Sequence, residues 1–369
     1  MNKSILDQVI YSQKMNALSQ FDPEDLASRL FEVLNDREKD IIVKRYGLKG
    51  DPKVTLEEIG SAYKVTRERV RQVENASLKR IKEAMTEDAL KELATLVQAS
   101  LEEQGDIMSE RRLIESLLPS DKSTESNAAL IRFVLNQLLA DKLSPRKEDD
   151  HVYKAWALPA ASWEKYHKIV DKLTELLEKH GEPLTLEDLV ERAKDHVNTT
   201  ADSNVAADVI IVNYLDVTKK IEENKFKEWG LAHWSSITPK RMNDKIYLVM
   251  KKEGKPMHFV EIAKKINEAK FDSRVAYPAT IHNELILDKK YVLVGRGIYA
   301  LTEWGFKPGV VVDVIRDIIN ASAKPLNRDE IIERVLKHRM VKKSTVMLAL
   351  MNKKVFKRNA DGTYQVIAA

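Results

Sequence analysis

Four polar side chains that stand close together in the sequence could read the edges of base pairs. They are Arg67, Glu68, Arg71 and Gln72. An arginine guanidinium can donate two hydrogen bonds to O6 and N7 of guanine, a glutamine amide pairs with adenine, and a glutamate accepts a hydrogen bond from N4 of cytosine. Each good bidentate pair favours the correct base by about 1–3 kcal/mol. These four residues are therefore candidate base-reading residues for double-stranded DNA.

Neighbouring residues carry groups that suit phosphate better than bases. They are Thr66, Arg69, Lys79, Arg80 and Lys82. Hydrogen bonds and ion pairs to phosphate position a protein on the duplex without specifying sequence. A solvent-exposed helix face would carry the same residue types, and this alternative stands beside the phosphate-binding interpretation.

Two helices joined by a tight turn are expected to hold these side chains. The first has apolar residues at helical spacing, namely Leu56, Ile59 and Tyr63. Thr55 is its expected N-cap, Glu58 completes a capping box, and Thr66 is placed to cap the second helix. The apolar side of the second helix consists of Val70, Val73 and Leu78. The pattern predicts a helix-turn-helix whose second helix enters the major groove.

This region resembles region four, the C-terminal promoter-binding domain of bacterial primary sigma factors. The resemblance rests on four motifs in order, at residues 34–38, 45–48, 55–60 and 65–74. It implies that residues 31–86 read the minus-35 promoter element with the four candidate base-reading residues and rest on the flap of the RNA polymerase core. The family also implies that the helix surface at 36–46 contacts the polymerase. A generic helix-turn-helix with a different target is the alternative.

The segment before these motifs is expected to add little beyond packing. Residues 1–30 contain apolar positions typical of one or two helices, and we expect an N-terminal helical extension. A whole sigma factor has a large upstream domain that grips the polymerase and melts the minus-10 element with aromatic residues. Because the short segment does not resemble that domain, the chain is expected to act as an accessory regulator and not to open a promoter by that route.

The rest of the chain contains a fourfold internal repeat. Similar short segments occur at 105–109, 181–185, 254–258 and 323–327. Each follows an amphipathic helix and precedes two further helices and an aromatic strand, at 153–158, 227–231, 297–301 and 362–366. Repeats of about seventy residues with three helices and a terminal hairpin are typical of winged-helix domains. The predicted fold is mainly α with small β-wings, in which the sigma-like helix-turn-helix precedes winged-helix domains at 87–160, 163–236, 239–306 and 309–369.

The third repeat resembles the HARE helix-turn-helix domain. The resemblance rests on residues 254–259, 262–266, 279–285 and 291–305. That family includes the delta subunit of RNA polymerase in Gram-positive bacteria, so the resemblance implies a transcription or DNA setting and no fixed activity. A winged helix that is used only for protein contacts is the alternative.

A second basic patch lies in the last repeat. Residues 334–360 contain lysines and arginines but no acidic residue. The candidate nucleic-acid contacts in this patch are Lys337, Arg339, Lys342, Lys343, Lys353, Lys354, Lys357 and Arg358. Clustering of basic residues on one element is typical of nucleic-acid binding. A solvated surface, or a contact with an acidic polymerase surface, would use the same charges.

Composition narrows the class of protein. The chain has 369 residues and no cysteine, which excludes disulfides, thiol catalysis and cysteine-containing zinc sites. The histidines and carboxylates show no metal-site or catalytic spacing, so we expect no metal, no cofactor and no enzymatic activity. No apolar run approaches the roughly 18 residues that span a bilayer, and the N-terminus lacks a signal-peptide pattern. We expect a cytoplasmic protein that does not bind membranes.

Three functions fit these observations. The first is a DNA-binding transcription factor that reads a promoter-like sequence and contacts RNA polymerase. The second is a polymerase-associated adaptor, bound to the flap, that acts through protein contacts. The third is a DNA-targeting module of a restriction or modification system. The intact base-reading group favours the first function, because an adaptor does not need it. The oligomeric state and the choice between activation and repression are not indicated.

Overall fold

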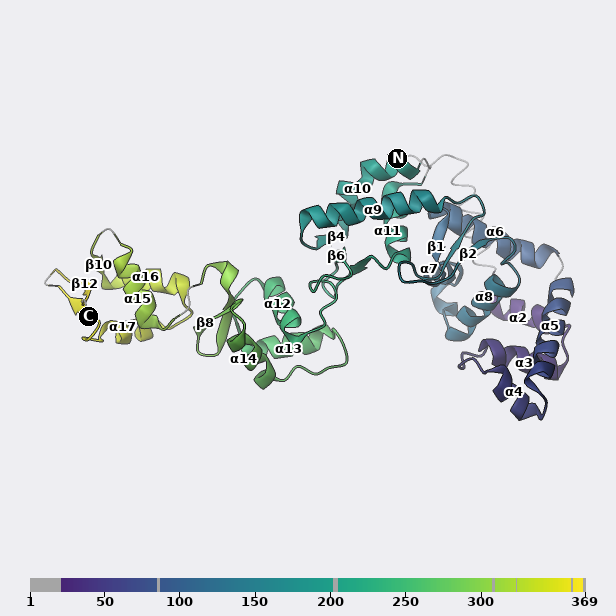
Figure 1. Cartoon of the computed structure of the whole chain (residues 1–369), viewed down its shortest axis with the longest axis horizontal. Helices are drawn as coiled ribbons and strands as arrows, with labels where there is room; N and C mark the ends of the chain where they lie inside the picture. Colours follow the sequence, from purple (N-terminus) through teal and green to yellow (C-terminus); the bar gives the residue numbers. More distant parts are fainter. Residues whose placement is uncertain are drawn as a thin grey trace. The chain divides into compact units, whose positions relative to one another are not determined.

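The computed structural model describes residues 21–84, 87–201, 205–306, 309–322, 324–359 and 361–367 (Figure 1). The fold is mostly helical, with 57% helix and 16 α-helices among these residues. The described strands form four small antiparallel three-stranded sheets. The prediction of a mainly α fold with small β elements is confirmed. Most of the predicted N-terminal extension, residues 1–20, lies outside the described residues.

The chain forms two compact units, Met1–Glu222 and Glu223–Ala369. The described part of the first unit begins with four helices, which are α2 (Pro23–Phe31), α3 (Asp36–Tyr46), α4 (Leu56–Tyr63) and α5 (Arg67–Ala84). Capping boxes open two of them, with Asn35 and Glu38 at α3 and Thr55 and Glu58 at α4. These reciprocal bonds satisfy backbone N–H groups that have no partner within the helix. The capping prediction for α4 is confirmed.

Four groups of elements follow in the same order. The first is α6 (Glu87–Glu103), β1 (Ile107–Ser109), α7 (Glu110–Leu117), α8 (Glu125–Gln137), β2 (Ser144–Arg146) and β3 (Ala155–Ala157). The second is α9 (Trp163–His180), β4 (Leu184–Thr185), α10 (Leu186–Ala201), α11 (Ala207–Val217), β5 (Ile221–Glu223) and β6 (Glu228–Leu231). The third is α12 (Met242–Glu253), β7 (Met257–His258), α13 (Phe259–Ala269), α14 (Pro278–Leu287), β8 (Tyr291–Gly295) and β9 (Ile298–Leu301). The fourth is α15 (Val311–Asn320), β10 (Leu326–Asn327), α16 (Arg328–His338), α17 (Lys343–Leu350), β11 (Phe356–Arg358) and β12 (Thr363–Val366).

The four groups pair their strands in the same way, in agreement with the predicted repeat. The strand orders are β1-β3-β2, β4-β6-β5, β7-β9-β8 and β10-β12-β11, so the last strand of each group is central. In three sheets this central strand places an aromatic residue opposite an apolar one. The pairs are Trp156 with Met108, Tyr299 with Met257 and Tyr364 with Leu326. The assignment of the groups to the winged-helix class, and of the third group to the HARE family, stays a prediction, as do the domain boundaries.

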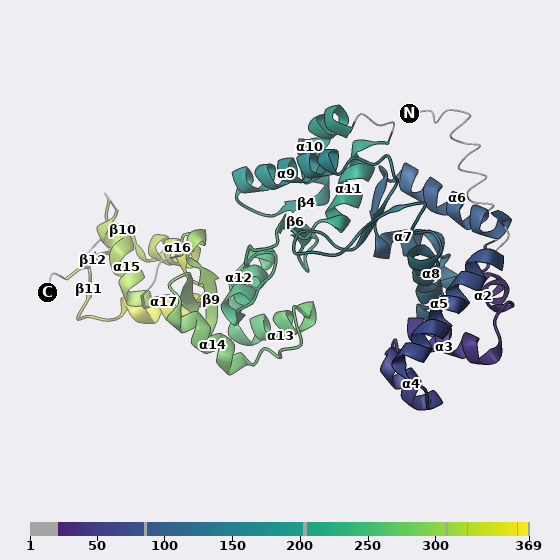
Figure 2. The same ribbon diagram turned by 45° about the vertical axis from the view of Figure 1, so that its right-hand side comes forward.

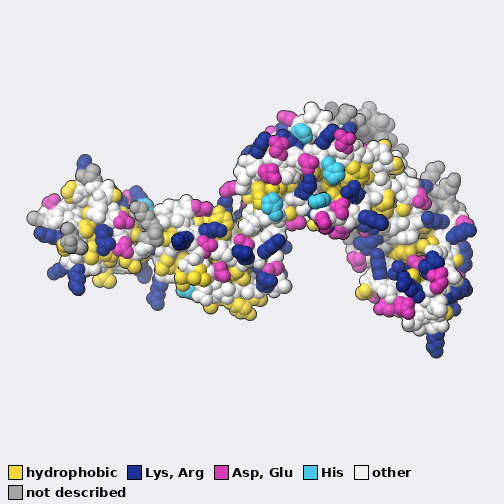
Figure 3. Space-filling view, in the orientation of Figure 1, with side chains coloured by type: hydrophobic (Ala, Val, Ile, Leu, Met, Phe, Trp, Pro, Cys, Tyr) yellow, Lys and Arg dark blue, Asp and Glu magenta, His cyan; other side chains and the backbone are white. Residues whose placement is uncertain are grey.

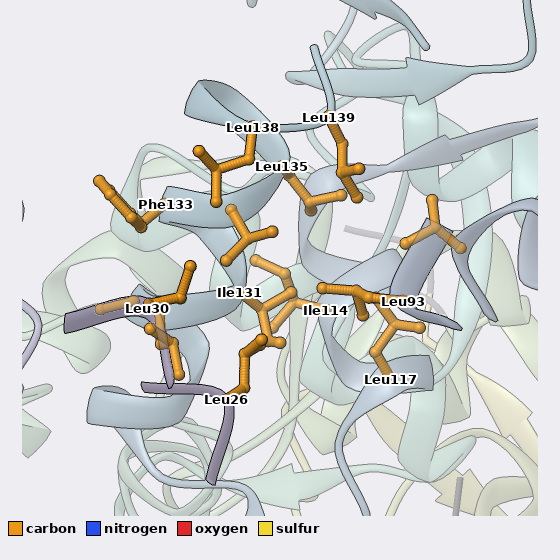
Figure 4. Packing of buried hydrophobic residues seen from close by; sticks show 14 of the residues in the cluster. Leu26, Leu30, Leu93, Ile114, Leu117, Ile131, Phe133, Leu135, Leu138 and Leu139 are labelled. Carbon is orange, nitrogen blue, oxygen red and sulfur yellow. The ribbon is translucent and has the colours of Figure 1, made fainter. Parts of the chain in front are cut away.

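One apolar core joins α2, α3 and α5 to the first repeat. Leu26 and Leu30 of α2 lie in the same buried cluster as Ile114 of α7 and Ile131 of α8 (Figure 4). Trp156 of β3 belongs to the same cluster. Because these residues bury one another, the segment before residue 87 shares its main core with the first repeat. The predicted boundary between residues 30 and 31 falls inside α2.

The second repeat is fixed to the first by buried hydrogen bonds within the first unit. The side-chain amide of Asn213, in α11, donates to the carbonyl oxygens of Gln104 and Ile107, the first at 2.8 Å. The Tyr214 hydroxyl donates to the carbonyl of Gly105 at 3.2 Å. Asn213 is fully buried. Since these partners belong to the loop before β1 and to the first residue of β1, α11 packs against the first repeat.

A buried arginine joins the third and fourth repeats within the second unit. Arg339 follows α16 and is 4% exposed. Its guanidinium donates to the carbonyl oxygens of Leu293, in β8, and Gly309. The N–H of Met340 donates to the carbonyl of Val294 at 3.0 Å. Desolvation lowers the pKa of Arg339. The prediction that Arg339 belongs to an exposed nucleic-acid patch is wrong, because the side chain is buried and its two terminal nitrogens donate to backbone carbonyls inside the protein.

We predict that Arg339→Ala destabilises the second unit. Removal of the guanidinium leaves two carbonyl groups without their partner, and a buried group that loses its hydrogen bond costs about 1–3 kcal/mol. Urea unfolding of the full chain measures the loss. Arg334→Ala is the matched control because Arg334 is exposed, and we expect a change within about 0.5 kcal/mol. Equal stability of the two variants would contradict the structural role of Arg339.

Candidate nucleic-acid interface

The turn between α4 and α5 depends on Gly60, which has no side chain. After α4, Lys64 adopts a left-handed conformation with φ of 56°, and the N–H of Val65 donates to the carbonyl of Gly60 at 2.9 Å. A Cβ atom on Gly60 would lie 2.8 Å from the Val65 carbonyl oxygen. The backbone of the turn therefore approaches α4 more closely than any other residue type allows. Helices α3, α4 and α5 lie together in both views (Figure 1 and Figure 2).

The inner side of α5 fixes the direction of its outer side. Val70 is fully buried in a small cluster with Ile41 of α3 and Ile59 of α4. Farther along α5, Ile81 is fully buried in the shared core of the first unit. The Oγ1 atom of Thr66 accepts a hydrogen bond from the N–H of Arg69 at 3.2 Å, which confirms the predicted cap. Both ends of α5 are thus anchored, and rotation about its axis would break the two clusters.

The predicted base-reading residues lie together on the outer side of α5. All four are exposed, as are Lys79 and Lys82. At about 100° per residue, Glu68, Arg71, Gln72, Lys79 and Lys82 fall on the side of the helix opposite Val70 and Ser77, and Arg67 lies on the flank next to Arg71 in the first turn. Arg69 and Arg80 fall on a different flank. The structure therefore brings together the residues Arg67, Glu68, Arg71, Gln72, Lys79 and Lys82. We call this set the α5 outer surface.

Two members of the α5 outer surface form a bidentate ion pair. The Nε and Nη2 atoms of Arg71 donate to the two carboxylate oxygens of Glu68 at 2.9 and 2.7 Å. The hydrogen bond from Arg71 lowers the pKa of Glu68 and raises that of Arg71. Because a guanidinium carries five donors, the edge formed by Nη1 and Nη2 keeps donors free for O6 and N7 of a guanine. Glu68 can thus orient Arg71 without occupying the edge that reads the base.

The predicted phosphate contacts divide into two kinds. Lys79 and Lys82 are exposed, and their nearest carboxylates, Glu83 and Asp141, lie 3.7 Å away. Long ion pairs between exposed groups are weak, so both amines can turn to a phosphate. Arg80 instead forms an ion pair with Glu38 of α3, whose side chain is 12% exposed. Its guanidinium therefore braces α5 against α3, a role that the sequence did not indicate.

The helix surface at 36–46 is only partly accessible. The Tyr46 ring packs edge-to-face against Phe133 of α8 with centroids 4.8 Å apart, and its hydroxyl donates to Glu74 at 2.8 Å. Desolvation raises the pKa of Tyr46 well above its usual value. The exposed residues of α3 are Asp36, Arg37, Lys39 and Lys44. A partner that binds α3 would therefore contact these four side chains and not the end near Tyr46.

The second basic patch is exposed apart from Arg339. Lys342, Lys343, Lys353, Lys354, Lys357 and Arg358 are all exposed. Lys337 is also exposed and lies 3.3 Å from the carboxylate of Glu333.

In the part of the chain that the structure describes, no three histidine, aspartate or glutamate residues come together in a metal-binding arrangement. Among the same residues, no helix is both long and apolar enough to cross a bilayer.

Comparison with known proteins identifies the segment that carries the α5 outer surface. Residues 30–83 match the family described as Sigma-70, region 4. These residues are a Sigma-70 region 4 domain. RNA polymerase sigma factor SigA of Nostoc sp. is 42% identical over 69 residues, which are 19% of this chain and 17% of that protein. RNA polymerase sigma factor RpoD of Helicobacter pylori is 48% identical over 63 residues, 16% of this chain and 9% of that protein.

Each of these relatives matches a short part of the chain. RNA polymerase sigma factor SigA of Lactococcus lactis subsp. cremoris is 40% identical over 53 residues, 14% of this chain and 15% of that protein. The match thus covers less than a fifth of this chain and of each relative. No solved structure shows a significant match to the chain.

We predict that Gly60→Ala disrupts the region 4 domain. The added methyl group would force the Val65 carbonyl away from α4, and an overpacked site of this kind costs about 1–3 kcal/mol. Thermal unfolding of the full chain measures the change. Ser61→Ala is the control, since Ser61 is exposed in the same helix and its loss is expected to cost less than about 0.5 kcal/mol. If Gly60→Ala unfolds at the temperature of the wild type, the tight turn is not a constraint.

Proposed function

We propose that this chain is a DNA-binding transcription factor that reads a promoter minus-35-like element with the α5 outer surface. The observation that carries the proposal is the joint exposure of Arg67, Glu68, Arg71 and Gln72 on a helix whose opposite side is buried. These side chains supply the donors and acceptors that distinguish base pairs in the major groove. Lys79 and Lys82 extend the same face toward the backbone of the duplex.

We also propose that the region 4 domain brings the chain to the RNA polymerase core, with the flap as the contact. The support is the similarity to RNA polymerase sigma factors and the exposed side of α3. In this proposal the chain acts by binding and carries out no catalysis. Its four repeats act as winged-helix domains, the third of them HARE-like, that extend the contacts of the region 4 domain.

The base-reading proposal predicts that two pairs of substitutions on one surface have different effects. Arg67→Ala/Arg71→Ala should reduce the preference for a minus-35-like hexamer by roughly tenfold or more, while binding to an unrelated duplex persists. Lys79→Ala/Lys82→Ala should weaken binding to both duplexes and reduce the slope of log K against log salt by roughly 0.9 for each phosphate that the protein no longer neutralises. Fluorescence anisotropy across a salt series measures both effects.

The full chain is needed in this experiment because the region 4 domain shares its core with the first repeat. Loss of hexamer preference in both variants alike, or no preference in the wild type, would contradict base reading by α5. The polymerase contact is tested separately, by binding of the full chain to core polymerase with and without the flap. Equal binding to both forms would contradict the flap as the contact.

A further inference from the structure

The third helices of the four repeats differ in how much of their surface is exposed. In a winged-helix arrangement the third helix is the one that enters a groove. In α8, Glu125 is the only exposed residue, because the helix lies in the shared core. In α11, Asp208 is the only exposed residue, because Asn213 and Tyr214 bind the loop before β1. A buried helix whose exposed residue is acidic cannot read DNA, so α8 and α11 are structural.

The third helix of the fourth repeat is exposed and apolar. Met347, Leu348 and Met351 are 41%, 72% and 73% exposed. At about 100° per residue they fall on one side of α17 and its C-cap, while Val346 and Leu350 are buried on the other side. Exposed large apolar side chains that are grouped together mark an interaction surface. We call Met347, Leu348 and Met351 the α17 surface.

Four exposed lysines flank the α17 surface in the sequence, and we call them its margin. Lys342 and Lys343 precede it in the chain and Lys353 and Lys354 follow it, and all four are exposed. No acidic residue occurs between positions 334 and 360. Figure 3 shows dark blue lysine and arginine side chains beside yellow apolar ones at the C-terminal end of the chain, at the left of the view. A partner that covers the α17 surface must therefore present carboxylates around an apolar centre.

The two exposed helices α5 and α17 differ in chemistry. The α5 outer surface offers arginine, glutamate and glutamine, which can each hydrogen-bond a base edge. The α17 surface offers no such group at its centre, and in the major groove the apolar contact open to its side chains is with thymine methyl groups. Methionine side chains, which are flexible and polarisable, suit a protein partner whose shape is not rigid. The comparison favours protein over DNA as the ligand of α17.

We propose that the α17 surface binds an acidic amphipathic helix of a partner protein. The apolar side of that helix packs on Met347, Leu348 and Met351, and its carboxylates pair with the four lysines of the margin. The apolar residues of such a helix recur at helical spacing, as they do in other amphipathic helices that bind proteins. The proposal does not depend on base reading by α5.

The chain offers a matched control surface. The third helix of the third repeat, α14, exposes Ile286 and Leu287 at 61% and 80%. Its other exposed residues are Pro278, Ala279, Thr280 and Asn283, none of which is charged. Because α14 also exposes an apolar pair but is followed only by Lys289 and Lys290, with no lysine among the three residues before it, its substitution tests whether an exposed apolar pair with fewer lysines around it binds equally well.

The probe is a labelled helical peptide of about eighteen residues, with leucine at helical spacing and glutamate at the other positions. A second peptide has lysine in place of glutamate. Fluorescence anisotropy with the full chain should show binding of the acidic peptide and not of the basic one. Leu348→Ser/Met351→Ser should weaken it by roughly tenfold or more, as for the central residues of an interface. Lys353→Glu/Lys354→Glu should also weaken binding of the acidic peptide, and this loss of affinity should be larger at low salt than at high salt.

Several results would overturn the proposal. One is equal binding of the acidic and the basic peptide. Another is a loss of affinity in Ile286→Ser/Leu287→Ser as large as that in Leu348→Ser/Met351→Ser, because the α14 variant should bind the acidic peptide as the wild type does. A third is that Leu348→Ser/Met351→Ser abolishes binding to duplex DNA or to vesicles that contain phosphatidylserine but not to the acidic peptide. Unfolding temperatures of all variants should match the wild type, since the substituted residues are exposed.

Discussion

Burial along one side of α5 is the constraint on which the rest of the first unit depends. Val70 packs with α3 and α4, and Ile81 packs in the core that also holds α2, α6, α7 and α8. These two contacts set the rotation of α5 about its axis and direct Arg67 and Arg71 outward. The Ile81 contact also binds the region 4 domain to the first repeat, which makes the repeat a structural extension of that domain.

Local signals in the sequence predicted much of this arrangement. Capping boxes, glycines at turns and aromatic strands depend on neighbours in the chain, so the helix-turn-helix and the order of elements in the repeats could be read directly. Contacts between residues that are far apart in the sequence could not be predicted from such local signals. Arg339 belongs to a run of basic residues, yet its acceptor Leu293 lies 46 residues earlier. Arg80 pairs with Glu38 across 42 residues. Charge patterning does not reveal such distant partners.

The exposed helices suggest a division of roles within the chain. The outer side of α5 is polar and rich in bidentate hydrogen-bonding groups, whereas α8 and α11 are covered and α17 is apolar with a cationic margin. A chain built in this way would read DNA once, through the region 4 domain, and use later repeats for rigidity and for protein contacts. This explains how a modest net charge of +4 is compatible with two different binding surfaces.

The central claim is that Arg71 reads a base, and a double-mutant cycle tests it most directly. Each G·C pair of the bound hexamer is replaced in turn by A·T, and affinities are measured for the wild type and for Arg71→Ala. The account predicts that one replacement costs the wild type about 1–3 kcal/mol and costs Arg71→Ala almost nothing, while other replacements affect both proteins equally. If every replacement has the same cost in both proteins, Arg71 does not read a base.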